Sequence, residues 1–203
     1  MPKIIDHEKQ KIEIAEATWD VIIEEGLQNA SVRKIAKVAG ISVGSLRHYF
    51  STQSELLLFS MKLVSDRVKQ RIAQRGYTNY SLEVLEEVLS QFLPFDEERR
   101  IEMEVWLIFN ANALVDSKLK NLSTNVYDEM HQCIQNFVNG LIKLQYTKEN
   151  LDMELEIHRL HALIDGMAMH HLLYPDKFNK EQMTNILTCH LRSICKNSRG
   201  NSR

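Results

Sequence analysis

The chain has 203 residues, of which 44% are hydrophobic and 26% charged, and its formal net charge is −2 at pH 7. This is the composition of a soluble globular protein, and the length is enough for a core that needs no metal or disulfide staple. The nearly balanced charge gives no bulk attraction to nucleic acid, so such a function has to appear in local charge patterning.

Apolar residues recur at helical spacing along the whole chain, and no segment alternates with the period of a strand. The chain also has few structure breakers, with seven glycines and three prolines. We therefore predict an all-α fold of about nine helices. Their approximate ranges are 8–25, 31–40, 42–50, 54–75, 82–92, 96–114, 119–144, 153–173 and 180–196.

The ends of the first three helices are predicted from their capping residues. Gly26 and Gly40 stand where a helix C-cap favours positive φ. Ser31 and Ser42 are good N-caps for the short second and third helices. The second and third helices are thus joined by a tight turn that contains glycine.

A window around these two helices lacks acidic residues. No Asp or Glu occurs between Leu27 and Ser54, whereas the window contains four basic residues: Arg33, Lys34, Lys37 and Arg47. Two short helices joined by a tight turn form a helix-turn-helix, whose second helix enters the DNA major groove while the first crosses the backbone. The window therefore favours DNA as a partner.

Residue size in this hairpin suits the same interpretation. Ala36, Ala39 and Gly40 are small where the two helices touch. The outward positions of the third helix carry short side chains and one long donor: Val43, Gly44, Ser45, Arg47 and His48. The alternative is an ordinary helical hairpin with a solvated basic face.

Individual contacts follow from the chemistry of the side chains. Arg47 is suited to a bidentate contact with guanine, worth roughly 1 to 3 kcal/mol of discrimination, and Val43 and Ser45 to base edges. The residues expected to grip phosphates are Ser31, Arg33, Lys34, Tyr49 and Thr52.

The segment SVRKIAKVAGISVGSLRHYFSTQSELL resembles the signature of the TetR family of bacterial transcriptional repressors. The shared pattern is a Ser/Thr opening, I-A-x-x-A-G-[VI]-S, G-x-L-x-x-Y-F and E-L-L. The resemblance implies an N-terminal three-helix DNA-binding domain, a fourth helix that links it to a helical ligand-binding domain, and a homodimer.

Side-chain chemistry and the resemblance together give a set of DNA-binding residues: Ser31, Arg33, Lys34, Val43, Gly44, Ser45, Arg47, His48, Tyr49, Thr52 and Gln53. Two of these positions depart from the family pattern. The family often has Tyr in place of Arg47, and usually Lys in place of Gln53. The side chain of Gln53 can hydrogen-bond a phosphate, but it carries no charge.

Two C-terminal segments, EVWLIFNANALVDSKL and ALIDGMAMHHLLYPDKF, resemble the BetI-like subset of that family. The resemblance implies a helix-turn-helix domain over 1–53 and a ligand-binding and dimerisation domain over 54–196. The polar sequence over 197–203 is typical of a disordered tail. The resemblance also implies dimerisation through the last two helices. The operator should then be a rough palindrome, because two recognition helices about 34 Å apart enter successive major grooves.

Apolar faces of the larger domain supply candidates for a ligand pocket with a few polar groups. They are Leu85, Leu89, Phe92, Met103, Trp106, Phe109, Asn110, Tyr127, Met130, Ile134 and Phe137. The alternative for each of them is plain core packing. The effector itself is not indicated.

Other chemistry is less well supported by the sequence. His158, His161 and Asp165 share one helical face and suggest a metal site, but no fourth donor follows at motif spacing, so no metal or other cofactor is predicted. No nucleophile elbow, P-loop or G-x-G-x-x-G motif occurs, and no enzymatic activity is expected. The rival hypothesis is a small-molecule-binding or metal-dependent helical protein with an incidental basic hairpin.

Location is predicted from the cysteines and the N-terminus. The chain has an odd number of cysteines, Cys133, Cys189 and Cys195, without C-x-x-C spacing. This pattern suits the reduced thiols of a cytoplasmic protein. The N-terminal segment is charged throughout, and no apolar run approaches the roughly 18 residues of a membrane span. We therefore expect a cytoplasmic protein that does not enter membranes.

Overall fold

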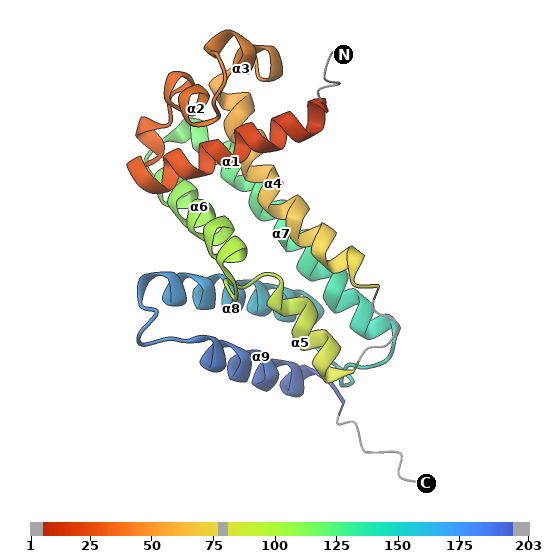
Figure 1. The fold of residues 1–203 in the computed structure, drawn as a ribbon. Coiled ribbons are helices and arrows are strands. Elements are labelled where there is room, and N and C mark those ends of the chain that lie inside the picture. The colour runs from red at the N-terminus through yellow and green to blue at the C-terminus, as the bar shows by residue number, and fades with distance from the viewer. Residues whose placement is uncertain (1–5, 77–80, 197–203) are drawn as a thin grey trace. The chain divides into compact units, whose positions relative to one another are not determined.

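A computed structural model describes residues 6–76 and 81–196, and within these ranges the chain is all-helical, as predicted (Figure 1). The helices are α1 (His7–Glu25), α2 (Val32–Val38), α3 (Val43–Tyr49), α4 (Gln53–Gln74), α5 (Leu82–Ser90), α6 (Glu97–Ala113), α7 (Ser117–Lys143), α8 (Met153–Leu173) and α9 (Lys180–Ile194). A short 3-10 helix, η1 (Leu27–Asn29), was not predicted. The predicted tail, 197–203, lies outside the described residues.

The described chain forms two compact units that do not follow chain order. The first contains residues up to 67 together with 101–126, and the second contains 68–100 together with the chain from 127 onward. Helices α4, α6 and α7 therefore each contribute to both units. The functional division of the chain at residue 53 stays a prediction.

The first unit is organised around the buried face of α1. Ile14, Trp19 and Ile22 on this helix are each at most 2% exposed. The indole Nε1 of Trp19 donates to the backbone oxygen of Ser60 on α4 at 3.0 Å, which satisfies the polar atom of a buried ring. This bond fixes the N-terminal part of α4 against α1.

Arg67, the last residue of α4 in this unit, joins three helices. Its guanidinium carbon lies 4.9 Å from the ring centroid of Trp19, and it pairs with Glu16 on α1. Its Nη1 atom lies 3.8 Å from the carboxylate of Glu102 on α6, whose side chain is 0% exposed. A buried carboxylate is costly unless a cation and hydrogen bonds compensate it, so Arg67 offsets much of the cost of burying Glu102.

The second unit packs α5 and α8 against α9. The hydroxyl of Thr188 on α9 donates to Glu86 on α5 at 2.6 Å. Asp152 caps the start of α8, and Asn179 with Gln182 forms a capping box at the start of α9. An isolated antiparallel bridge pairs Thr147 with Cys195, and it is the only β pairing among the described residues.

Within the described residues, no helix has both the length and the apolar character needed to cross a membrane.

We predict that Arg67→Met lowers the free energy of unfolding by about 3 kcal/mol, because it removes the cation beside a fully buried carboxylate. The double variant Arg67→Met/Glu102→Leu should recover most of this loss, since it removes both charges. Urea denaturation measures both values. Arg100→Met is the control, because Arg100 pairs with the exposed Glu97 and should contribute less than about 1 kcal/mol. Equal losses in the single and double variants would contradict the prediction.

Candidate DNA-binding hairpin and effector cavity

The hairpin of α2 and α3 is built by local capping, as predicted. The Ser31 hydroxyl accepts from the backbone N–H of Lys34 at 3.4 Å, and the Ser42 hydroxyl accepts from that of Ser45 at 3.0 Å. Gly40 has φ of +66°, in the left-handed region that favours glycine. The N–H of the next residue, Ile41, donates back to Ala36 at 3.0 Å, which closes the end of α2.

The hairpin packs through a small apolar core. Ile35 and Ala36 on α2 are at most 2% exposed, as are Leu46 on α3 and Phe50, which follows that helix. The ring of Phe50 lies 5.2 Å from that of Phe59 on α4. This core leaves the opposite face of α3 open to solvent.

The predicted DNA-binding residues on α3 and beside it are all at least partly open to solvent. Ser31, Arg33, Gly44, Arg47, His48, Thr52 and Gln53 are exposed, and Lys34, Val43, Ser45 and Tyr49 are half-buried. Their roles in binding stay predictions. The long, exposed side chain of Arg47 has the reach that a base contact needs.

Several of these side chains already have partners within the chain. Gln53 donates from Nε2 to the backbone oxygen of Ala30 at 2.8 Å, and Lys34 forms an ion pair with Glu25. Thr52 caps the start of α4 by accepting from the N–H of Glu55 at 3.1 Å. Lys34 and Gln53 would therefore have to exchange these partners to bind a phosphate.

Two interactions around the hairpin were not predicted. The ring of His7, in the first turn of α1, lies 4.6 Å from the ring of Tyr49. Glu55, the first acid after the basic window, accepts from both the N–H and the hydroxyl of Ser51. The hydroxyl hydrogen bond of Ser51 lowers the pKa of Glu55, so this acid stays ionised. The contact of His7 with Tyr49 depends on helix placement, which the sequence pattern does not encode, whereas the contact of Ser51 with Glu55 is local.

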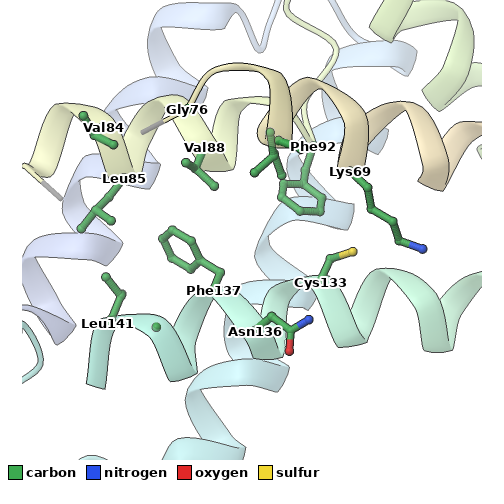
Figure 2. A pocket seen from close by; sticks show the side chains of 13 residues that line it. Lys69, Gly76, Val84, Leu85, Val88, Phe92, Cys133, Asn136, Phe137 and Leu141 are labelled. Atoms are coloured by element: carbon green, nitrogen blue, oxygen red, sulfur yellow. The ribbon is translucent and has the colours of Figure 1, made fainter. Parts of the chain in front are cut away.

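A cavity of about 460 Å³ lies in the second unit (Figure 2). Its described wall comes from α4, α5 and α7, with Gly76 and Phe92 just beyond helix ends. The lining residues are Lys69, Ile72, Ala73, Gly76, Val84, Leu85, Val88, Phe92, Cys133, Asn136, Phe137, Gly140 and Leu141. The volume falls in the range of small-molecule sites.

Three of the eleven predicted ligand residues line this cavity: Leu85, Phe92 and Phe137. In the same unit, Leu89 and Ile134 are 0% exposed core residues, Met130 is 8% exposed and Tyr127 is 45% exposed. Ligand contact by any of them stays a prediction.

The four remaining candidates belong to the first unit. Met103 and Phe109 are buried there. Asn110 donates to the backbone oxygen of Trp106 at 2.8 Å and accepts from the Ser123 hydroxyl at 2.5 Å. None of these four is among the described lining residues of the cavity.

A separate cluster of rings joins α7 to α8. The Nδ1 atoms of His131 and His161 are 3.2 Å apart, which requires one nitrogen to donate and the other to accept. Tyr127 stacks on His161 with centroids 4.7 Å apart, and the ring of His158 lies 4.9 Å from that of His131. Across the described residues, no group of three or more histidine, cysteine or acidic side chains is arranged to hold a metal ion.

The charges in this cluster are set mainly by burial. Burial lowers the pKa of His161 to about 4, with help from His131 and His158. Burial also raises the pKa of Asp165 to about 6. The imidazole is therefore neutral at pH 7, and its 3.7 Å approach to Asp165 is a polar contact rather than an ion pair.

These shifts predict opposing effects of pH on stability. The pKa of His161 is lowered on folding, so protonation favours the unfolded chain. The contribution of His161 to the free energy of unfolding is therefore lost as pH falls from 6.5 towards 4, by at most about 1.4 kcal/mol per pH unit. The pKa of Asp165 is raised, so its contribution is lost as pH rises from 3.8 through 6. Between pH 7 and 5, His161→Asn should therefore lose less stability than the unsubstituted protein, and Asp165→Asn should lose more. Urea unfolding at both pH values measures this, and parallel pH profiles for all three proteins would contradict it.

Two family matches cover most of the chain. Residues 14–58 match the family described as bacterial regulatory proteins, tetR family, and residues 81–196 match the BetI-type transcriptional repressor, C-terminal family.

Relatives of known name agree with these matches over nearly full length. The HTH-type transcriptional regulator PksA of Bacillus subtilis is 43% identical over 196 residues, covering 96% of this chain and 94% of that protein. The regulator BetI of Vibrio campbellii is 27% identical, covering 94% of each chain.

Solved structures agree in fold. A transcriptional regulator from Rhodococcus sp. Rha1 has a TM-score of 0.74 at 27% identity, covering 91% of this chain and 95% of that one. A putative regulator from Saccharomonospora viridis, solved with choline, has a TM-score of 0.76 at 22% identity, covering 93% and 99%. The chain belongs to the TetR family of bacterial transcriptional regulators, and its C-terminal region is of BetI type.

Proposed function

We propose that the protein is a homodimeric repressor that binds a palindromic operator and releases it when a small effector enters the cavity. The observation that carries the proposal is the hairpin of α2 and α3, which combines exposed Arg33 and Arg47 with a window free of acids. Phosphate contacts from such a surface supply affinity, and base contacts from α3 supply specificity. Operator binding would take place in the cytoplasm, and no catalytic step is needed.

An apolar stripe on α8 supports the dimer. Leu155, Met169 and Leu173 lie on one face of this helix and are 57%, 38% and 54% exposed. Ala162 and Gly166 lie between them on the same face, and such small residues let two helices approach closely. A two-fold axis along this face would bury the stripe in a bundle with α9, as a closed symmetric dimer requires. The two α3 helices would then need to lie about 34 Å apart to read a palindrome.

The cavity supports control by an effector. One structural neighbour, the regulator from Saccharomonospora viridis, was solved with choline. An effector lowers operator affinity only by the difference between its affinities for the two conformations. Moving a 1:99 balance to 99:1 requires about 5.5 kcal/mol of such preference, which a ligand that fills an apolar cavity can provide.

The proposal predicts different effects for Arg47 and Arg33. Arg47→Ala should cost roughly 1 to 3 kcal/mol on the operator and little on scrambled DNA, because a base contact is lost. Arg33→Ala should weaken binding to both sequences and lower the salt slope by about 1, because a phosphate contact is lost. Fluorescence anisotropy at two salt concentrations measures both effects. If Arg47→Ala left discrimination unchanged, the rival hypothesis of an incidental hairpin would be favoured.

The dimer is tested by placing charge on the stripe. Met169→Glu/Leu173→Glu should yield monomers in size-exclusion chromatography with light scattering, because two carboxylates would be buried at the interface. The same variant should lose most operator affinity, since one recognition helix reads only half the site. Lys177→Glu, an exposed change outside the stripe, is the control. A double variant that stayed dimeric would contradict the assignment of this interface.

A further inference from the structure

The polar groups of the cavity gather at one end. Figure 2 shows Lys69, Cys133 and Asn136 on one side of the cavity, and Val84, Leu85 and Leu141 on the other. The sequence agrees with this view. Within α7, Cys133 and Asn136 precede Leu141 by more than one helical turn. The cavity therefore has an apolar body and one polar end.

Among the described lining residues, the polar end has one cation and no carboxylate. Lys69 is the only charged side chain among the described lining residues, and its ammonium group lies 2.9 Å from Glu129, which does not line the cavity. Asn136 accepts from Gln132 at 3.0 Å through its side-chain oxygen, so its amide N–H groups remain as donors. These groups suit a ligand atom that accepts hydrogen bonds or carries negative charge.

The described part of this wall offers a cationic ligand few favourable contacts. Quaternary ammonium groups bind in cages of aromatic faces, and a buried cation needs an anion close by. The described wall contains two aromatic rings, Phe92 and Phe137, and no carboxylate. A trimethylammonium group would meet hydrocarbon at one end and, at the other, the Lys69 ammonium with its partner Glu129 behind it.

We propose that this cavity takes an amphipathic ligand with an apolar body and a single neutral or anionic head, and that it disfavours a quaternary ammonium group. The ligand class deepens the proposed function and rests on it. The head would lie near Lys69 and Asn136, and the body against Val84, Val88 and Leu141. Binding would thereby reach α4 directly, through Lys69, Ile72 and Ala73.

Three probes with the same ten-carbon chain separate head charge from chain burial: decanoate, decan-1-ol and decyltrimethylammonium. Isothermal titration calorimetry of the full-length protein without DNA should give decanoate and decan-1-ol a Kd at least tenfold below that of the cation. Choline alone should not compete with decanoate. Equal or tighter binding of decyltrimethylammonium, or no binding of any probe, would overturn the proposal.

Gly140 allows the cavity to be filled without straining the fold. A Cβ at this position meets no atom within 4 Å, and leucine favours a helix more than glycine does. Gly140→Leu should raise the Kd for decanoate at least tenfold, whereas Gly140→Ala, which gains helix propensity and adds one methyl group, should change it less than threefold. Unchanged decanoate binding in Gly140→Leu would place the ligand elsewhere and overturn the proposal.

Operator binding by the ligand-free, unsubstituted protein separates this inference from the proposed function. Failure of the unsubstituted protein to bind DNA would contradict the proposed function, whatever the calorimetry shows. Normal DNA binding with preference for the cationic probe would contradict only the ligand class.

Discussion

Helix α4 imposes the constraint on which the rest of the structure depends, because one continuous backbone serves both compact units. Its residue Arg67 holds Trp19, Glu16 and the buried Glu102 in the first unit. Two residues further on, Lys69 lines the cavity of the second. A helix resists bending because every turn is hydrogen-bonded to the next. In the proposed mechanism, a ligand that displaces the cavity end of α4 must therefore either move Arg67 or strain its contacts.

The candidate DNA-binding surface depends on local interactions within the α2–α3 hairpin. Capping by Ser31 and Ser42 starts the two short helices, and Gly40 turns the chain between them. The small core of Leu46 and Phe50 then holds α3 with its basic face in solvent. In the proposed mechanism, the hairpin needs only to be reoriented as a body for operator affinity to change. This suits control through α4 better than control by remodelling α3 itself.

The sequence predicts features that depend on neighbouring residues and misses those that depend on tertiary contact. The caps and the glycine turn were predicted correctly because they are formed within a few residues. The sequence does not locate the cavity, and the predicted ligand residues Trp106 and Phe109 are not among its described lining residues. Its wall instead contains Ala73, Gly76 and Gly140, because space remains where side chains are small. The contact of Arg67 with Glu102 joins positions 35 residues apart, and no local pattern encodes it.

The most direct test of the central claim is fluorescence anisotropy of the purified protein on the DNA upstream of its own gene. Scrambled DNA of equal length is the comparison, at two salt concentrations. A specific regulator should prefer the native segment by a factor of about 10³ or more, with affinity that falls steeply as salt rises. Equal and weak binding to both DNAs would contradict the claim that the α2–α3 hairpin reads an operator.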